Sequence, residues 1–126
     1  MILNLTQHKA TPDQVADGVI DLPDYMREKL IDLLTFDDIP SKRDVIETAG
    51  NIAALAHLWM LQNDPNNISP KAMIGGALFL ICPLENELIF RGFTVVYSFS
   101  RRQSKETVLP DGTVSKTSEF KHIGWV

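Results

Sequence analysis

The sequence predicts an α/β fold, a Rossmann-like three-layer sandwich with a mainly parallel sheet and a C-terminal antiparallel hairpin. Short apolar runs with β-branched residues, at residues 1–5, 71–74 and 94–99, are separated by stretches with helical periodicity. Strands that alternate with helices favour parallel pairing through right-handed crossovers. Two further runs, at residues 105–109 and 113–120, alternate in polarity on either side of a Pro-Asp-Gly turn. We therefore expect a hairpin there, at an edge of the sheet.

The first helices are marked by the residues at their ends. Thr11 followed by Pro12 is a favourable helix entry, and Gly18 ends or interrupts the helix that they begin. A second helix is expected to begin at residue 21 or 23, and the polar, proline-containing residues 37–40 break it.

The remaining elements follow from similar signals. Ser41 followed by Asp44 resembles a capping arrangement, and apolar residues recur on one helical face up to residue 62, which predicts the longest helix over residues 41–62. A strand follows at residues 71–74. Pro83 is expected to open a short helix that ends before Gly92, and the strand at 94–99 comes next.

Composition narrows the class of protein. The 126 residues, 44% hydrophobic and 22% charged, predict a single Rossmann-like domain, residues 1–126, of the soluble globular kind. No apolar run is long enough to span a membrane and no signal-peptide pattern opens the sequence, so we interpret the chain as cytoplasmic. The lone Cys82 excludes an intrachain disulfide and is expected to be a small buried thiol. The three histidines lack metal-ligand spacing, so neither a metal nor another cofactor is expected.

Charge is distributed unevenly along the chain. The formal net charge is −4, yet residues 1–70 hold 5 basic and 11 acidic side chains, whereas residues 91–126 hold 6 basic and 3 acidic ones. This balance argues against binding long nucleic acid, which requires a broad basic surface. It allows a small anionic ligand to bind near the C-terminal part, but charges distributed in this way more often only solvate an exposed hairpin.

Polar residues follow each of the three predicted parallel strands, where ligands bind in open α/β sheets. Hydroxyl, imidazole and guanidinium groups and paired glycines suit the oxygens of a phosphate. We therefore predict a ligand site at this sheet edge that contains Thr6, His8, Gly75, Gly76, Ser98, Ser100, Arg101 and Arg102. Of these, Ser100, Arg101 and His8 are the candidate catalytic residues, although a histidine beside a strand end, such as His8, more often only caps the next helix.

Several common enzyme motifs are absent from the sequence. It contains neither the G-x-G-x-x-G dinucleotide pattern nor the G-x-x-x-x-G-K-[ST] phosphate loop, which argues against an ordinary NAD or ATP enzyme. Ser98 and Ser100 have no G-x-S-x-G motif around them, so no serine–histidine–acid triad is predicted. A positioned arginine and hydroxyl remain compatible with phosphoryl transfer in which the ligand supplies its own 2′-hydroxyl.

Both ends of the chain resemble a known family. The segments are residues 3–8 (LNLTQH), 11–14 (TPDQ), 95–102 (VVYSFSRR), 109–114 (LPDGTV) and 120–122 (FKH). They resemble small CRISPR-associated Rossmann-fold (CARF) proteins of antiviral defence, including ring nucleases. The resemblance implies a homodimer that binds a cyclic oligoadenylate at the strand ends and, in ring-nuclease members, cleaves it without metal. Phe99 stands where the family more often has a hydroxyl residue.

The leading hypothesis is therefore a protein that binds, and as a ring-nuclease-like phosphodiesterase also cleaves, a nucleotide second messenger at the carboxyl edge of the sheet. Two alternatives remain open. One is a non-enzymatic protein-interaction module of phage or mobile-element origin, and the other is an enzyme that acts on a different phosphorylated small molecule.

Overall fold

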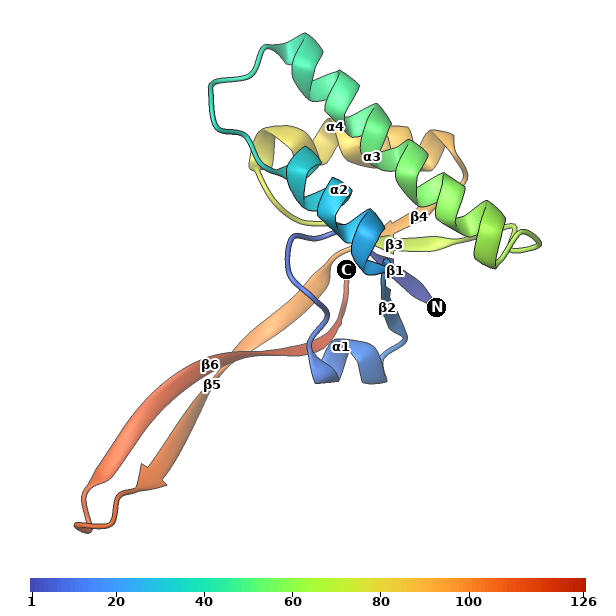
Figure 1. Cartoon of the computed structure of the whole chain (residues 1–126). Coiled ribbons are helices and arrows are strands. Elements are labelled where there is room, and N and C mark those ends of the chain that lie inside the picture. The colour runs from blue at the N-terminus through green and yellow to red at the C-terminus, as the bar shows by residue number, and fades with distance from the viewer.

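The computed structural model describes all residues, 1–126, and consists of a four-stranded parallel sheet with helices on both faces and a projecting hairpin (Figure 1). The sheet contains β1 (Ile2–Asn4), β2 (Val19–Asp21), β3 (Lys71–Met73) and β4 (Thr94–Val96) in the order β2-β1-β3-β4. The register pairs Leu3 with Ile20 on one side and with Ala72 on the other. The predicted α/β class is confirmed.

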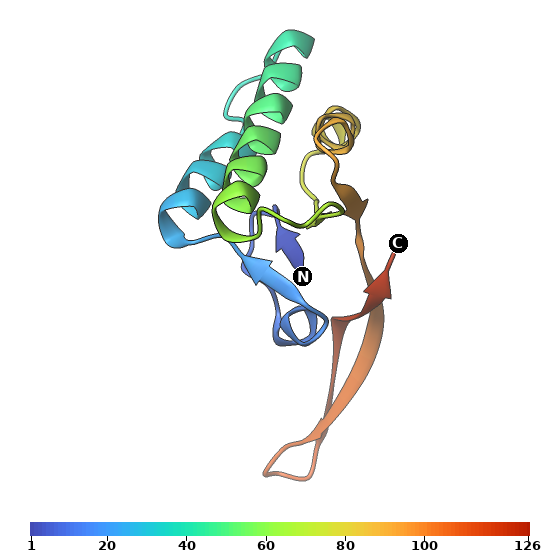
Figure 2. The same cartoon turned by 90° about the vertical axis from the view of Figure 1, so that its right-hand side faces the viewer.

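Helices form the two outer layers, as the view along the sheet shows (Figure 2). The helices α2 (Asp24–Leu34), α3 (Lys42–Asn63) and α4 (Leu78–Phe90) lie on one face, and the short α1 (Pro12–Ala16) lies on the other. None of these helices combines the length and the apolar character that crossing a membrane requires.

The core divides along the same two faces, because successive strand residues point to opposite sides of the sheet. Leu3 and Ala72 belong to a cluster of 18 buried residues beneath the three large helices. Ile2, Val19 and Met73 form a smaller cluster on the α1 face, against which Trp125 packs. Burial on the α1 face is thus provided in part by Trp125, at the C-terminal end of β6.

The predicted helix entries are formed by reciprocal capping. Thr11 and Gln14 cap α1, and Ser41 and Asp44 cap α3, each pair exchanging side-chain and backbone hydrogen bonds. The long helix at residues 41–62 is confirmed with bounds Lys42–Asn63. Gly18, which follows α1, has a φ of 97° and turns the chain into β2.

Two predictions about the elements between α1 and β4 were wrong. The strand β2 was missed, because three residues between a glycine turn and the next helix carry no visible period. The helix α4 begins at Leu78, so Pro83 lies inside it and does not open it. Leu80, Leu84 and Leu88, all at 0% exposure, form one buried helical face. We infer that their burial outweighs the one backbone hydrogen bond that a proline removes.

Cys82 is exposed, which corrects the expected buried thiol. Its place on α4 explains the difference, because a residue two positions from the buried Leu80 lies on the far side of a helix. Since the helix begins five residues before Pro83, the cysteine belongs to a solvent-facing surface and not to a strand or a core turn.

The C-terminal hairpin is longer than predicted and does not join the edge of the parallel sheet. Its strands β5 (Ser98–Val108) and β6 (Val114–Trp125) pair antiparallel in a separate two-stranded sheet, which corrects the expected position. We call this projecting element, residues 98–125, the arm (Figure 1). Nearly all of its residues are exposed, apart from those at its base. The arm buries little surface against the body of the protein. No third strand pairs with its outer part.

Candidate functional site

A cavity of about 430 Å³ opens where β1, β3 and β4 end. Side chains or backbone from the segments after all three strands line it, as the parallel pairing requires. The lining residues are Thr6, His8, Lys9, Thr11, Gln14, Met73, Ile74, Tyr97 and Ser98. This set contains hydroxyls, an amide, an imidazole and an ammonium group but no carboxylate, although the chain has 16 acidic side chains.

The segment that follows β1 is held in place by a buried asparagine. The amide of Asn4, at 0% exposure, donates from Nδ2 to the carbonyl of His8 at 2.8 Å and to Asp21 Oδ1 at 2.7 Å. Its Oδ1 accepts from the backbone N–H of Thr6 at 2.9 Å and from the Thr6 hydroxyl at 2.7 Å. Since all four contacts are satisfied, the cavity wall from Thr6 to His8 is fixed before any ligand arrives.

An irregularity in the arm determines which side chains face α1. Phe99 pairs with Gly124 and Ser100 pairs with His122, so Ile123 is an extra residue in β6. One extra residue shifts the alternation of side chains by one position. His122 and Trp125 therefore lie on the same side of the arm, and their ring centroids are 4.5 Å apart.

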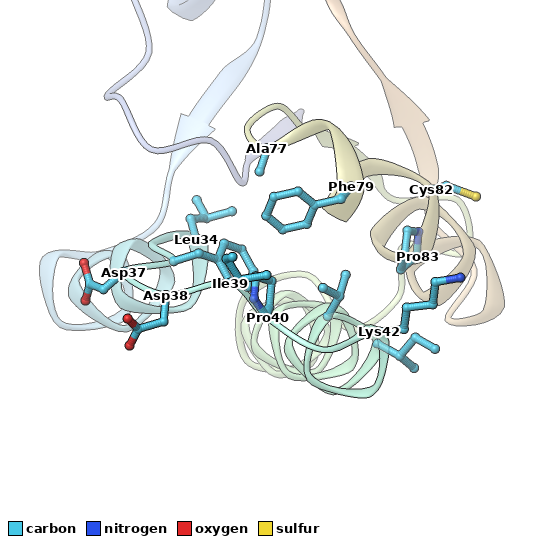
Figure 3. A pocket seen from close by; sticks show the side chains of 13 residues that line it. Leu34, Asp37, Asp38, Ile39, Pro40, Lys42, Ala77, Phe79, Cys82 and Pro83 are labelled. Carbon is cyan, nitrogen blue, oxygen red and sulfur yellow. The ribbon is translucent and has the colours of Figure 1, made fainter.

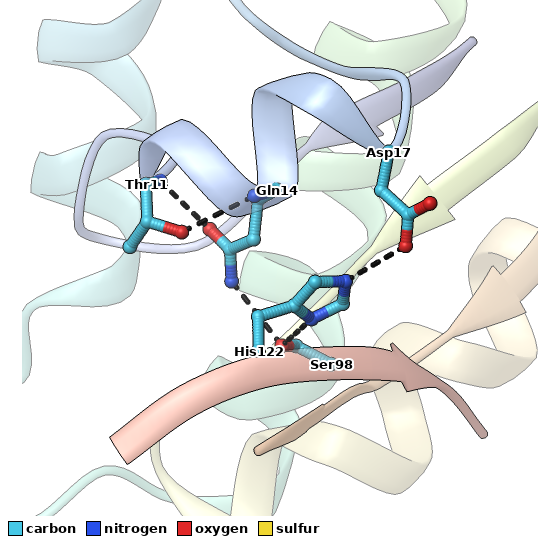
Figure 4. Close-up of polar contacts among 5 residues, drawn as sticks. All are labelled: Thr11, Gln14, Asp17, Ser98 and His122. Atoms are coloured by element: carbon cyan, nitrogen blue, oxygen red, sulfur yellow. Dashed lines mark hydrogen bonds and ion pairs between the residues drawn. The ribbon is translucent and has the colours of Figure 1, made fainter. Parts of the chain in front are cut away.

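At the base of the arm, polar side chains from α1, β5 and β6 form a continuous hydrogen-bonded chain (Figure 4). Gln14 Nε2 donates to Ser98 Oγ at 3.2 Å, and Ser98 Oγ lies 2.6 Å from His122 Nδ1. On the other side of the ring, His122 Nε2 lies 2.9 Å from Asp17 Oδ2. The His122 side chain is 4% exposed, whereas that of Asp17 is 50% exposed. We call Ser98, His122 and Asp17 the serine–histidine–aspartate chain.

Tyr97 connects the same region to the opposite layer. Its hydroxyl donates to Glu85 Oε2 on α4 at 2.5 Å. Burial of the phenol, together with the hydrogen bond and negative charge of Glu85, raises the pKa of Tyr97 to about 12. The tyrosine therefore stays protonated at neutral pH and acts as a donor that ties the end of β4 to α4.

The structure brings part of the predicted site together. Thr6, His8 and Ser98 line the cavity. Gly75 adjoins it, because a Cβ built there would lie 3.5 Å from the Thr6 methyl group. Gly76 is not a lining residue, and the nearest atom to a Cβ built there is Leu34 Cδ2 at 4.0 Å.

The other predicted site residues lie along the arm and do not line the cavity. Ser100 pairs with His122 in the register, and Arg101 pairs with Lys121. The guanidinium of Arg102 lies over the Phe120 ring, 5.3 Å from its centroid. Alternation places Arg101 on the opposite face of the strand from Ser100 and Arg102. Within one chain, neither arginine belongs to the set of residues around the cavity.

Four residues of this region were not among the predicted site residues, namely Lys9, Gln14, Asp17 and His122. Gln14 has two roles, and only the capping role is visible in the sequence. Its Oε1 accepts a hydrogen bond from the Thr11 backbone N–H, while its Nε2 donates to Ser98 Oγ. For His122 a signal existed, because it ends a segment, residues 120–122, that is part of the family resemblance. Asp17 lies 105 positions from His122, so no local pattern could connect the two.

A larger and more open hollow of about 1,140 Å³ lies between the segment that joins α2 to α3 and the first turns of α4 (Figure 3). Apolar side chains such as Leu34, Phe79 and Pro83 dominate it, while Asp37 and Asp38 point their carboxylates away from the Phe79 ring. It lacks the convergent polar groups that would orient a ligand. No group of three or more His, Cys, Asp or Glu side chains is arranged to hold a metal ion. We therefore take the cavity at the strand ends as the candidate site.

Comparison with known proteins gives one family and no closer relative. No curated protein and no solved structure matches the chain significantly. Over residues 1–126, its whole length, the chain matches the family described as "Uncharacterized protein MJ1673 family", and it belongs to that family.

Proposed function

We propose that the protein binds a small anionic nucleotide, of the second-messenger class that includes cyclic oligoadenylates, in the cavity at the carboxyl edge of the sheet. One observation carries the proposal: in an acidic chain, this cavity is lined by hydroxyl, amide, imidazole and ammonium groups and by no carboxylate. Phosphate oxygens are acceptors with negative charge, so a set of donors without carboxylates favours them.

The size and rigidity of the cavity support this class of ligand. Its volume of about 430 Å³ lies within the range of small-molecule sites. Because Asn4 fixes the wall from Thr6 to His8, little conformational entropy is lost when a ligand binds there. Lys9 is the one lysine or arginine among the lining residues, and it is the natural contact for a phosphate.

A homodimer forms the second part of the proposal. A ring of several nucleotides is larger than this cavity, so a single chain would hold part of it and a second copy the rest. The arm supplies the further contacts in this proposal, because it is the basic part of the chain. Residues 98–126 hold 5 basic and 3 acidic side chains, whereas residues 1–97 hold 7 basic and 13 acidic ones. In this arrangement Arg101 and Arg102 would contact the ligand held by the partner copy.

The test is a thermal-shift and calorimetry screen against cyclic oligoadenylates, cyclic dinucleotides and linear nucleotides. We expect saturable binding that Lys9→Glu weakens at least tenfold, because the substitution replaces an attractive charge with a repulsive one at the phosphate. Lys29→Glu is the matched control, since Lys29 is exposed on α2 and does not line the cavity. Equal loss in both variants, or no binding of any nucleotide by the wild type, would refute the proposal.

Arg101→Glu tests the dimer in the same screen. Because Arg101 does not line the cavity of its own chain, loss of binding in this variant requires that the arm of another copy completes the site. Unchanged binding with a monomeric mass in solution would remove the dimer from the proposal and leave the cavity as the whole site.

A second candidate, a protein-interaction module, is favoured by the surface of the arm. Phe99, Val108, Val114 and Phe120 are each at least 50% exposed on a two-stranded sheet that has no third strand. If this is the function, Phe120→Ser should abolish capture of the partner while Lys9→Glu leaves it intact. An effect of Lys9→Glu alone would favour the nucleotide site instead.

A further inference from the structure

We infer that Ser98 is a nucleophile, activated by His122 and Asp17, that attacks phosphorus in a phosphodiester bound in the cavity. The inference rests on the proposed function and adds covalent catalysis to binding. It differs from a reaction in which the ligand supplies the attacking hydroxyl, because here the attacking oxygen belongs to the protein.

The geometry specifies where the proton of His122 lies. Asp17 Oδ2 is 2.9 Å from His122 Nε2, and a carboxylate at this distance requires a hydrogen on that nitrogen. In the neutral ring Nδ1 is then the free acceptor, and it faces Ser98 Oγ at 2.6 Å. The serine hydroxyl therefore donates to the histidine, which is the arrangement that a general base needs in order to remove the proton.

The position of Ser98 relative to the cavity connects this chain to a ligand. Ser98 is a lining residue, while His122 lies behind it with 4% of its side chain exposed. Oγ also accepts from Gln14 Nε2 at 3.2 Å, which leaves one lone pair free for attack. Lys9 and Thr11 line the same cavity and are available to contact the phosphoryl oxygens.

The reaction proceeds in two balanced steps. In the first step Ser98 Oγ forms a bond to phosphorus, its proton moves to His122 Nδ1, and the ester P–O bond breaks. The leaving alkoxide takes that proton from His122 and departs as an alcohol. In the second step water attacks the phosphoserine and gives a proton to His122, and Oγ leaves and recovers that proton. The net change is hydrolysis of one phosphodiester bond, with water as the only co-reactant.

A purely structural role would also explain hydrogen bonds between α1 and the arm, so the test must measure reactivity. A fluorophosphonate probe reacts by the proposed first step, with fluoride as the leaving group, and needs no knowledge of the ligand. We expect the wild-type protein to gain one phosphonyl group, located at Ser98 by peptide mass analysis.

Three variants separate activation from packing. Ser98→Ala should lose labelling, whereas Ser104→Ala should retain it, since Ser104 lies farther out on the same strand, is exposed and pairs with Ser118. Asp17→Asn keeps the size of the side chain but removes the charge that specifies the tautomer. It should slow labelling at least tenfold, and circular dichroism should show that the fold is retained.

The outcomes decide between the readings. A wild type labelled no faster than its urea-unfolded form, a label at another residue, or Asp17→Asn labelled at the wild-type rate would overturn the inference. The nucleotide screen is scored separately: binding without labelling refutes the nucleophile and keeps the site, and labelling without nucleotide binding refutes the nucleotide ligand and keeps the nucleophile. Protection of Ser98 by a bound nucleotide would support both.

Discussion

Asn4→Asp should disrupt the wall of the cavity while changing only one atom of the side chain. Asn4 Nδ2 donates to the His8 carbonyl and to Asp21 Oδ1. The substitution replaces this donor with a carboxylate oxygen, so that three acceptors face one another without a hydrogen. Two hydrogen bonds are lost, one of them to a carboxylate, and a second negative charge is placed 2.7 Å from Asp21 Oδ1 at a site of 0% exposure. From about 1 kcal/mol for the neutral bond and about 2 kcal/mol for the charged one, we expect at least about 3 kcal/mol of lost stability.

Urea unfolding followed by circular dichroism measures this loss, and amide hydrogen exchange shows where it is felt. Exchange should increase first at the backbone N–H of Ala10, which donates to Asp21 Oδ1, the carboxylate that the new charge repels. Acidification should reduce the difference from wild type, because burial and the nearby Asp21 favour the protonated form of the new carboxyl. Asn66→Asp, at an exposed position of the segment between α3 and β3, is the control and should change stability by less than about 0.5 kcal/mol. Equal effects of the two substitutions would refute the argument that Asn4 organises this wall.

Two further predictions concern Tyr97 and Gly76. The pKa of Tyr97 is raised to about 12 in the folded protein from 10.0, so its contribution to stability is complete below pH 10 and is lost as the pH rises towards 12. In a Tyr25→Phe background, which leaves one tyrosine, phenolate absorbance at 295 nm should therefore appear with a midpoint near pH 12, and a midpoint near 10 would contradict the contact with Glu85. Gly76 has a φ of +125° with its nearest side-chain atom, Leu34 Cδ2, 4.0 Å from a built Cβ, so Gly76→Ala should lower stability by about 1–3 kcal/mol through backbone strain alone. Gly50→Ala, at a helical position whose nearest atoms are also 4.0 Å away, should instead raise stability by up to about 1 kcal/mol, and a similar loss in both variants would refute the strain argument.

Features encoded locally were predictable from the sequence. The capped start of α3 depends on Ser41 and Asp44, which are three residues apart, and its apolar face continues over several turns. The parallel arrangement of the sheet follows from the alternation of strands and helices, and it correctly placed the segments containing Thr6 and Ser98 at one edge. These predictions held because neighbouring residues carry the information and tertiary contacts reinforce it.

Features for which tertiary packing overrides the local sequence signal were not predictable. Pro83 is a strong local signal for the start of a helix, yet α4 begins five residues earlier because Leu80 and Leu84 bury one face. The start of the arm was similarly misplaced. The predicted strand at 94–99 was expected to end in polar residues outside the sheet, but residues 98–102 are the beginning of β5, because their backbone pairs with residues of β6 that lie about 20 positions away.

The extra residue in β6 explains why the serine–histidine–aspartate chain could not be predicted from the sequence. Strict alternation along the strand would place His122 and Gly124 on one face and Trp125 on the other. With Ile123 inserted, His122 and Trp125 share a face, and Trp125 packs on the small apolar cluster of the sheet. Packing of this partly buried tryptophan therefore helps to determine which way the imidazole points, towards Asp17 on one side and Ser98 on the other. The one-residue irregularity thus links the apolar contact that anchors the arm to the polar contacts beside the cavity, and a sequence pattern read with period two misses both.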